Sequence, residues 1–495
     1  MKRLIVSLFV FTAISLGQPD TSWTKTFGGS GYETAFSCQQ TIDGGYIILG
    51  RTESYGNGDS DAWLIKTDSQ GNEEWNHTYG GALFDIGISL DQTTDSGYVI
   101  VGWTTSYVNG YNDVWLIKTD TNGDTLWTKT FGGTNQENGW YVQQTTDGGY
   151  IITGYTGSYG WYGDVWLIKT DSNGDSLWTQ TFDRNSNPDQ QYYSSDRGYS
   201  VQQTGDGGYI ISGEAYSFGN SDSVFVWLIK TDSNGDSLWT KSYGGGTVYD
   251  DGMSVQHTDD DGYIIVTTSA GNSGNTDVWL IKTDSNGDSL WTKIYGGSGE
   301  EQGYSVQQTT DGGYIITGLT TSFGNGGGDV WLIKTDFDGI EEWNQTFGGN
   351  GWDKGSSVQQ TADGGYVITG FTSSVGNAAG GDVWLIKTDS ESVVEIASTF
   401  NLPATYNIHQ NYPNPFNPIT TLRYDLPENG LVNVIIYDML GREVKTLINQ
   451  TQDAGYRSVI WDATNDYGKP VSAGIYLYQI QAGEYIQTKK MVLLK

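Results

Sequence analysis

The sequence predicts an all-β protein in which a seven-bladed β-propeller precedes a small β-sandwich. Two repeated segments carry the propeller prediction. WLIKTD begins at Trp63, Trp115, Trp166, Trp227, Trp279, Trp331 and Trp384. A WTKTFGG-type segment has its tryptophan at Trp23, Trp75, Trp127, Trp178, Trp239, Trp291 and Trp343. Repeats of about 40–50 residues that are rich in glycine, aromatic and β-branched residues are typical of propeller blades.

The order of the two segments predicts a closed ring. Each WLIKTD is followed by a WTKTFGG-type segment 12 residues later, except the one at Trp384. The unmatched copy of the second segment lies near the other end of the chain, at Ser22–Gly29. We therefore expect this strand to pair with Trp384–Asp389 and to complete the last blade, which removes the free sheet edges that an open array would expose.

Each repeat is expected to form four antiparallel strands. In one repeat these are Trp140–Thr145, Tyr150–Thr156, Val165–Thr170 and Leu177–Phe182. The connections at Asp147–Gly149 and Ser172–Asp175 are predicted hairpin turns, because Asp, Asn and Gly accept the positive φ angles of tight turns. The recurrent tryptophans are expected to fill the wedge between neighbouring sheets.

The first 17 residues are typical of a secretory signal peptide. A basic MKR precedes an apolar run, Leu4–Leu16, that is too short to span a bilayer. No other stretch is long and apolar enough for a transmembrane helix. The predicted propeller covers residues 18–389, a linker covers 390–410 and a last domain covers 411–495.

The chain is strongly acidic, with a formal net charge of −33 at pH 7. This charge opposes binding to nucleic acid or anionic lipid and favours cations, although a solvated acidic surface without a specific partner would carry it as well. The single cysteine, Cys38, excludes an internal disulfide. It stands where other repeats have valine, so we expect a small buried hydrophobic residue.

An acidic residue recurs six positions before the Gln-Gln pair, or its equivalent, of every repeat. The seven residues are Glu33, Asp85, Glu137, Asp196, Asp250, Glu301 and Asp353. Beside the innermost strands they could form a ring around one mouth of the central channel and bind a cation or sugar hydroxyl groups. Alternatively, each carboxylate caps its own loop by accepting backbone N–H bonds. Repetition in every blade favours this structural interpretation.

The repeat pattern is broken most strongly at Asp183–Tyr193, where an insertion replaces the usual FGG. Insertions map to binding faces in repeat proteins, and Tyr192 and Tyr193 could contact a carbohydrate or peptide. An ordinary tolerated loop insertion explains the segment equally well. The TDSNGDS turns resemble calcium loops, but they lack the EF-hand spacing and are expected to be hairpin turns. Calcium binding is kept as an alternative, and no other cofactor is expected.

The sequence after the repeats alternates apolar and polar residues and predicts a compact antiparallel, Ig-like sandwich. It begins with YPNPFNP and ends with KKMVLLK, and it contains YDMLGREV at Tyr437–Val444 and SAGIYLYQI at Ser472–Ile480. These motifs closely resemble the type A C-terminal sorting domain of the type IX secretion system. The matching sorting residues are Tyr412, Pro413, Asn414, Pro415, Phe416, Asn417, Pro418, Lys489 and Lys490.

The resemblance implies a cargo protein that the type IX machinery carries across a Gram-negative outer membrane and then releases or anchors at the surface. The repeats resemble bacterial surface propellers of the DGGYIITG type, which share no single activity. We therefore expect a secreted or cell-surface protein that binds a glycan or another extracellular ligand. One alternative is a polysaccharide hydrolase that uses two of the seven carboxylates. Another is a purely structural surface component.

Overall fold

The computed structural model describes residues 13–108, 111–159, 163–184, 195–217, 223–244, 254–270, 275–376, 380–396, 403 and 405–494. The chain divides into two compact units, one formed by Ser15–Val394 and one that contains Glu395–Lys495. The described residues are built from strands and turns. Among them, no helix has the length and apolarity needed to cross a bilayer.

Within Ser15–Val394, the described residues form seven four-stranded antiparallel sheets. Four of them are β3 (Glu33–Gln40), β4 (Tyr46–Thr52), β5 (Asp61–Thr67) and β6 (Glu73–Tyr79); β7 (Asp85–Gln92), β8 (Tyr98–Thr104), β9 (Asp113–Thr119) and β10 (Thr125–Phe131); β11 (Glu137–Gln144), β12 (Tyr150–Thr156), β13 (Asp164–Thr170) and β14 (Ser176–Phe182); and β15 (Arg197–Gln203), β16 (Tyr209–Ser217), β17 (Ser223–Thr231) and β18 (Ser237–Gly244). The other three are β19 (Ser254–His257), β20 (Tyr263–Ala270), β21 (Thr276–Thr283) and β22 (Ser289–Tyr295); β23 (Glu301–Gln308), β24 (Tyr314–Thr320), β25 (Asp329–Thr335) and β26 (Glu341–Phe347); and β27 (Asp353–Gln360), β28 (Tyr366–Thr372), β29 (Asp382–Thr388) and β2 (Thr21–Phe27).

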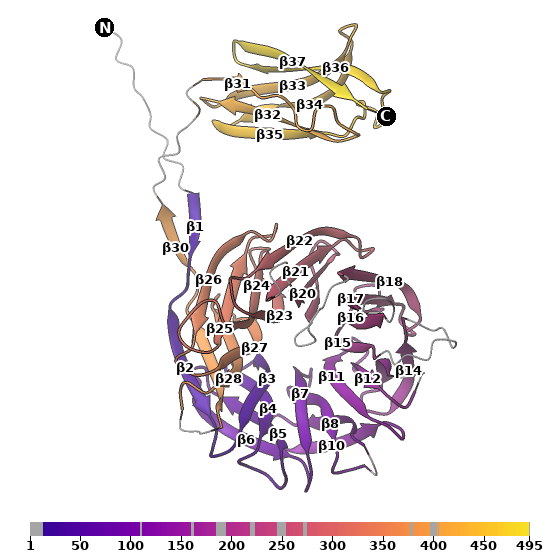
Figure 1. Ribbon diagram of the computed structural model, residues 1–495, viewed down its shortest axis with the longest axis vertical. Helices are drawn as coiled ribbons and strands as arrows, with labels where there is room; N and C mark the ends of the chain where they lie inside the picture. The colour runs from indigo at the N-terminus through magenta and orange to yellow at the C-terminus, as the bar shows by residue number, and fades with distance from the viewer. Residues whose placement is uncertain are drawn as a thin grey trace. The chain divides into compact units, whose positions relative to one another are not determined.

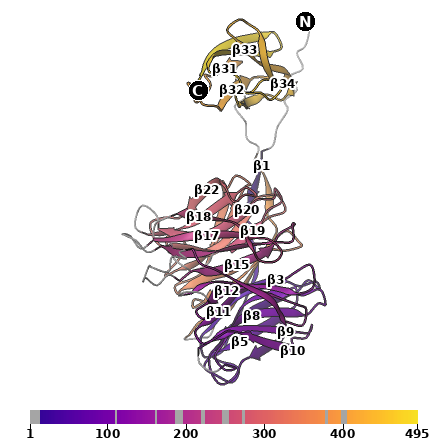
Figure 2. The ribbon, with the colours of Figure 1, turned by 90° about the vertical axis from the view of Figure 1, so that its right-hand side faces the viewer.

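The sheets follow one another around a ring, which gives this unit a propeller-like architecture (Figure 1). Each sheet packs against the next, and β27 and β28 of the last sheet contact β3 of the first. The last sheet is completed by β2, which pairs antiparallel with β29 and places Thr26 opposite Trp384. The pairing that the sequence predicts for the N-terminal strand is therefore confirmed. The side view shows the described strands of successive sheets (Figure 2).

The hydrophobic core of this unit lies between successive sheets. One cluster joins Leu49 and Leu64 of one sheet to Ile100 and Trp115 of the next. Equivalent clusters recur at the other interfaces and bury six of the seven WLIKTD tryptophans, while Trp279 is half-buried. The predicted role of the tryptophans in packing between sheets is confirmed.

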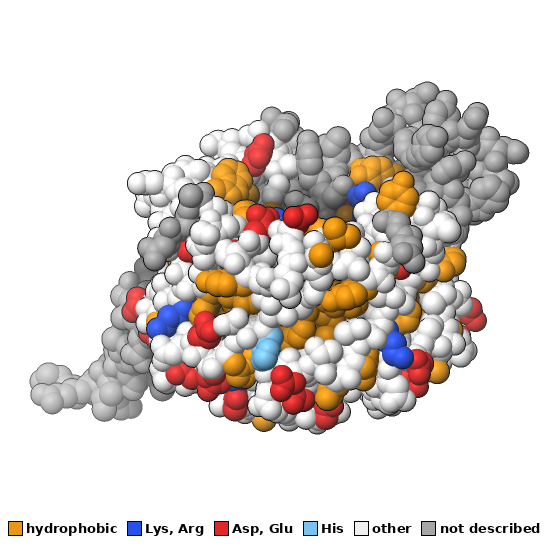
Figure 3. Space-filling model, turned by 90° about the horizontal axis from the view of Figure 1, so that it is seen from below, with side chains coloured by type: hydrophobic (Ala, Val, Ile, Leu, Met, Phe, Trp, Pro, Cys, Tyr) orange, Lys and Arg blue, Asp and Glu red, His pale blue; other side chains and the backbone are white. Residues whose placement is uncertain are grey.

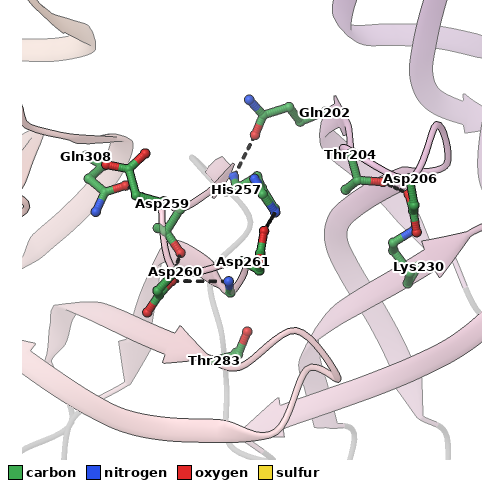
Figure 4. Close-up of polar contacts among 12 residues, drawn as sticks. Gln202, Thr204, Asp206, Lys230, His257, Asp259, Asp260, Asp261, Thr283 and Gln308 are labelled. Atoms are coloured by element: carbon green, nitrogen blue, oxygen red, sulfur yellow. Dashed lines mark hydrogen bonds and ion pairs between the residues drawn. The ribbon is translucent and has the colours of Figure 1, made fainter.

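Each sheet also contains a buried lysine that the sequence reasoning missed. Lys230 donates to Asp206 Oδ2 at 2.8 Å and to the carbonyl oxygen of Thr231 at 2.9 Å. Thr204 donates to the same carboxylate at 2.5 Å (Figure 4). The equivalent pairs are Lys66–Asp43, Lys118–Asp95, Lys169–Asp147, Lys230–Asp206, Lys282–Asp260, Lys334–Asp311 and Lys387–Asp363. The lysine of WLIKTD and the aspartate of the DGGY turn thus lock the second hairpin of each sheet to the first.

The C-terminal unit contains two sheets. β31 (Asn407–Ile408), β32 (Thr420–Leu426) and β35 (Gly455–Trp461) form one, and β34 (Glu443–Gln452), β33 (Gly430–Asp438), β36 (Gly474–Ala482) and β37 (Tyr485–Leu493) form the other. A single core made from both sheets includes Phe416, Trp461 and Tyr478. The two sheets therefore share one apolar interior.

Three short strands fall in segments that the sequence assigns to the signal peptide and the linker. β1 (Ala13–Gly17) pairs with β30 (Ser392–Ile396) in a separate two-stranded sheet. β31 also lies within the stretch 390–410 that the sequence predicts to be a linker. Backbone pairing thus extends into residues that the sequence analysis does not assign to strands.

Candidate functional site

A cavity of about 700 Å³ lies where the innermost strands of the seven sheets meet. Residues of β3, β7, β11, β15, β19, β23 and β27 all contribute to its lining. Its volume falls within the range of ligand pockets in proteins. We call it the axial cavity.

In six innermost strands, a β-bulge aims one side chain at the axial cavity. In six strands the pairing register shifts one residue after a glycine or alanine, as between Gly139 and Tyr141, so that one residue is left out of the ladder. Bulges turn a side chain out of its regular direction. The six bulge residues are Phe36, Ile88, Trp140, Tyr199, Tyr304 and Ser356, and all of them line the cavity.

The bulge residues differ from one repeat to the next, although their surroundings are nearly identical. A glycine or alanine precedes every one of them, and an apolar residue follows two positions later. Because the residue type varies at this position while the neighbouring positions repeat, formation of the sheet does not require a particular side chain there. The sequence carries this signal within the strands, whereas the predicted ligand-binding residues lie in loops and at the starts of strands.

Aromatic side chains gather on one part of the lining. The ring centroids of Trp103 and Trp140 lie 5.2 Å apart, and those of Trp140 and Tyr199 lie 5.5 Å apart, both pairs edge to face. The asymmetry of the cavity therefore comes from a run of three aromatic residues on three neighbouring sheets.

The charged residues that line the cavity are both cationic. Arg197 donates to the buried carboxylate of Glu214 at 2.6 Å, and Lys354 Nζ lies 5.5 Å from the centre of the Tyr304 ring. Although burial acts to lower it, Tyr199 and Glu214 raise the pKa of Arg197. Among the described residues that line the cavity there is no aspartate or glutamate, while the surface seen in Figure 3 carries many acidic side chains.

A closed belt of hydrogen bonds fixes the innermost strands beside the cavity. In each sheet, the side chain at the first position of the Gln-Gln pair accepts the backbone N–H of the second position in the next sheet. The bonds run from Gln40 N to Gln359, Gln92 N to Gln39, Gln144 N to Asp91, Gln203 N to Gln143, His257 N to Gln202, Gln308 N to Gln256 and Gln360 N to Gln307, at 2.5–2.9 Å. Figure 4 shows the bond from His257 to Gln202. The belt gives the cavity a rigid frame.

Six of the seven predicted acidic residues lie within the described chain, and they are fully buried. They are Glu33, Asp85, Glu137, Asp196, Glu301 and Asp353. Glu33, for example, accepts bonds from Gly29 N at 3.0 Å, Thr52 Oγ1 at 3.1 Å and Ser54 N at 3.1 Å. None of the six is among the residues that line the axial cavity. These contacts agree with the loop-capping interpretation and not with a ring of carboxylates exposed at the channel mouth.

The pKa of Asp196 is raised to about 6. Burial is the main cause, and bonds from the backbone of Arg184 and Tyr216 act in the opposite direction. Asp250, Tyr192 and Tyr193 lie outside the described residues, so their role in ligand binding stays a prediction.

The described residues contain no group of three or more His, Cys, Asp or Glu side chains that could hold a metal ion. In the TDSNGDS turn, Asp171 Oδ1 accepts the backbone N–H groups of Asn173 at 2.8 Å and Asp175 at 2.9 Å. The carboxylate that starts this turn thus closes a hairpin, and calcium binding stays a prediction. Cys38 is buried, and burial raises the pKa of its thiol to about 12, which makes it a poor nucleophile.

A comparison with protein-family models finds a match within the last domain. Residues 419–484 match the family model of the FlgD Ig-like domain. No curated protein matches the chain. Solved structures with some similarity include PorZ, an essential bacterial surface component of the type IX secretion system of Porphyromonas gingivalis, with a TM-score of 0.39 and 13% identity. That match covers 95% of this chain and 60% of PorZ, so this chain spans less than two thirds of PorZ.

Two glycoside hydrolases are also similar. The α-L-arabinanase of Penicillium chrysogenum, complexed with arabinobiose, has a TM-score of 0.39 and 9% identity over 74% of this chain and 98% of the enzyme. A thermostable family-43 glycoside hydrolase has a TM-score of 0.32 and 12% identity over 57% of this chain and 96% of the enzyme. Similarities this low do not establish a shared function.

Proposed function

We propose that the protein is a secreted or cell-surface seven-bladed β-propeller that binds an extracellular glycan in its axial cavity. One observation carries the proposal: the repeats agree where they build the sheets and differ at the bulge residues that face the cavity. A purely structural component would have no need to vary the side chain at this one position among six described strands that are otherwise nearly identical.

The composition of the lining supports a glycan as the ligand. Ligand pockets combine aromatic surface with a few polar groups that fix orientation. Trp103, Trp140 and Tyr199 supply apolar ring faces and edges against which a sugar ring can pack, and Gln136 and Asn138 supply amide groups that can bond hydroxyl groups. Both kinds of group lie on neighbouring sheets of the same part of the cavity.

The lining favours binding over hydrolysis. A glycosidase needs two carboxyl groups that flank the scissile bond. The predicted acids that the structure describes are buried in loop contacts, and no carboxylate belongs to the described lining of the cavity. A hydrolase is the alternative function. Among the predicted acidic residues that the structure describes, Asp196 would then be the candidate general acid, because its pKa is raised to about 6.

We further propose that the C-terminal unit is a type A sorting domain with an Ig-like sandwich fold, recognised by the type IX secretion machinery. The FlgD Ig-like match and the two sheets around one core support this fold. The YPNPFNP motif is built into the domain, because Phe416 is buried in the core and its N–H donates to the carbonyl oxygen of Val492 at 3.0 Å. Export would place the propeller outside the outer membrane, where glycans are available.

The test is a glycan-binding screen of the chain from residue 18 to 495, with and without calcium. For any glycan that binds, Trp140→Ala is expected to weaken the affinity at least tenfold, while Tyr467→Ala is expected to leave it unchanged. Tyr467 is 85% exposed on the C-terminal unit, so it serves as the matched aromatic control. Unchanged affinity in Trp140→Ala and Tyr199→Ala would place the site elsewhere. Release of shortened oligosaccharides from a bound glycan would show that the protein is a hydrolase and would contradict a function in binding alone.

A further inference from the structure

At five interfaces between successive sheets, two carboxyl groups come together beside the first glycine of the FGG-type segment. One belongs to the first residue of an innermost strand, and we call it the inner acid. The other belongs to the first or second residue of the third strand of the preceding sheet, and we call it the outer acid. The pairs of outer and inner acid are Asp382–Glu33, Asp61–Asp85, Asp113–Glu137, Asp277–Glu301 and Asp329–Asp353.

A glycine without a side chain makes room for each pair. A Cβ atom built on Gly80 would lie 1.7 Å from Asp61 Oδ1 and 3.0 Å from Asp85 Oδ2. The same glycine of the FGG segment has this position in the other pairs; at Gly132 the distances are 2.0 Å to Asp113 Oδ1 and 2.8 Å to Glu137 Oε2. The two carboxyl groups therefore face the same small space, and any other residue in place of the glycine would fill it.

The two acids of a pair have different partners. The inner acid Asp85 accepts bonds from Gly81 N at 2.7 Å, Ser106 Oγ at 2.6 Å and the hydroxyl group of Thr104. The outer acid Asp61 accepts one bond, from Asn57 N at 2.6 Å to Oδ2. Its Oδ1 is buried and has no hydrogen-bond partner within the described chain, and the same holds for Asp329 Oδ1.

Two ionised carboxylates cannot satisfy this geometry, because each offers only acceptors to the other. An unpaired buried carboxylate oxygen is costly, and burial beside a like charge favours the protonated form. A proton on the outer Oδ1 turns that oxygen into a donor to the inner carboxylate. We propose that each of these interfaces is a proton-binding site, in which the outer carboxyl group shares one proton with the inner carboxylate, and that mild acid therefore stabilises the ring.

The titration behaviour is consistent with the geometry. Burial, followed by repulsion from and hydrogen bonding to Glu137, raises the pKa of Asp113 to about 6. Burial and the inner acid also raise the pKa of Asp61, Asp277 and Asp329. The other titratable or charged groups near Asp113 include the hydroxyl group of Tyr159, which donates to Gly132 O at 2.9 Å. Near Asp61 they include Tyr107 and, beside Phe84, Arg51, which is paired with Glu53 at 3.8 Å.

A divalent cation is a poor fit to the same space. Calcium takes six to eight oxygen ligands. The pair offers two carboxyl groups, the inner of which already accepts several protein bonds, and the glycine backbone lies against the outer oxygen. A proton needs only the two facing oxygens.

The sign of the pH effect follows from the raised pKa of four outer acids, Asp61, Asp113, Asp277 and Asp329. Their stabilising contribution is complete below the pKa of an unfolded aspartate, about 3.9, and is lost as the pH rises through the folded value, about 6 for Asp113. The full-length protein should therefore have a thermal midpoint several degrees higher at about pH 5 than at about pH 8. Asp61→Asn and Asp113→Asn should reduce this difference, because asparagine supplies a permanent donor.

The experiment measures the thermal midpoint against pH for the full chain and for these two variants, with Asp338→Asn, an exposed turn residue, as the matched control. Infrared spectroscopy of the unmodified protein gives a second measurement that does not depend on the variants folding. We expect a protonated-carboxyl band that persists at about pH 5, where exposed aspartates are ionised. Absence of that band, or an unchanged pH dependence in both asparagine variants, would overturn the proposal. Stabilisation by calcium at pH 8 that is lost in Asp61→Asn would assign the site to a cation instead.

Discussion

The side-chain oxygen of Gln359 accepts a hydrogen bond from the backbone N–H of Gln40 at 2.7 Å, although the two residues are 319 positions apart in the chain. An equivalent bond joins each of the six remaining pairs of neighbouring innermost strands. The belt is therefore continuous across the point where the chain closes the ring. On the outside, the closure is made by β2 and β29. The last sheet is therefore held at its inner and its outer edge by residues from the opposite end of the propeller unit.

Removal of β2 is expected to open the ring. Without Thr21–Phe27, the strand β29 loses its outer ladder partner. The hydrophobic cluster between the last and the first sheet also loses Phe27 and Trp23. We expect a loss of cooperative thermal unfolding, measured by calorimetry on the chain from residue 28 to 495. The matched control is Lys25→Ala in the full chain, since Lys25 bonds only the exposed side chain of Asn72 and should change stability by less than about 0.5 kcal/mol. An unfolding transition identical to that of the full chain would contradict the closing role of β2.

The buried lysines make a measurable contribution to stability. Lys334 is fully buried and donates to Asp311 at 2.8 Å and to Glu342 at 2.9 Å. Asp311→Ala removes one of its two counter-charges, and because the aspartate side chain is 41% exposed we expect a cost of about 1–2 kcal/mol in urea unfolding, below the range for a fully buried pair.

The control for this prediction is Asp175→Ala. Asp175 forms a similar ion pair with Lys129 at 2.7 Å, but the Asp175 side chain is 67% exposed and the Lys129 side chain is 35% exposed, whereas Lys334 is fully buried. Its removal should cost less than about 1 kcal/mol. Equal effects of the two substitutions would mean that burial of the lysine contributes nothing.

The aspartates of the DGGY turns predict a separate loss of stability in strong acid. Although burial acts to raise it, bonds from Lys230, Thr204 and Gly208 lower the pKa of Asp206 to about 2. A depressed pKa gives stability that is present above the unfolded value, about 3.9, and is lost as the pH falls through about 2. We expect the thermal midpoint to drop steeply between about pH 4 and pH 2, and Asp206→Asn to make that drop shallower. A flat midpoint over this range would show that the turn aspartates are not linked to folding.

The sequence predicts much of the ring, because the repeated segments mark strands whose number and order can be counted. The unmatched WTKTFGG at Trp23 even predicts a pairing between residues more than 350 positions apart. The axial cavity could not be predicted in this way. The bulge that exposes Trp140 depends on a register shift between two strands, and the linear pattern does not show which residue leaves the ladder.

The predicted acidic ring illustrates a second limit of the sequence. The position of Glu33 at the start of an innermost strand is correct, but the direction of its side chain depends on donors from two loops. Those loops meet only in the folded ring. For the same reason, the pairing of Asp61 with Asp85 cannot be seen along the chain, since the two residues belong to different sheets.

The sorting motif should act through the fold of the last domain. Asn414 Oδ1 accepts the N–H of Val492 at 3.0 Å, and Leu494 N donates to the carbonyl oxygen of Phe416 at 2.8 Å, so YPNPFNP holds the end of β37 in place. Phe416→Ala removes a fully buried aromatic ring and should cost about 3–5 kcal/mol in this domain.

In a cell with type IX secretion, we expect both Phe416→Ala and deletion of Lys489–Lys495 to leave the protein in the periplasm, as measured by cell fractionation and surface labelling. The double change Lys489→Ala and Lys490→Ala separates recognition from folding, because Lys490 is exposed and neither lysine belongs to the core. If this variant folds normally but stays in the periplasm, the secretion machinery recognises the two lysines directly. Tyr467→Ala, an exposed change on the same domain, should be exported normally. Normal surface delivery of the deletion variant would contradict the assignment of a sorting domain.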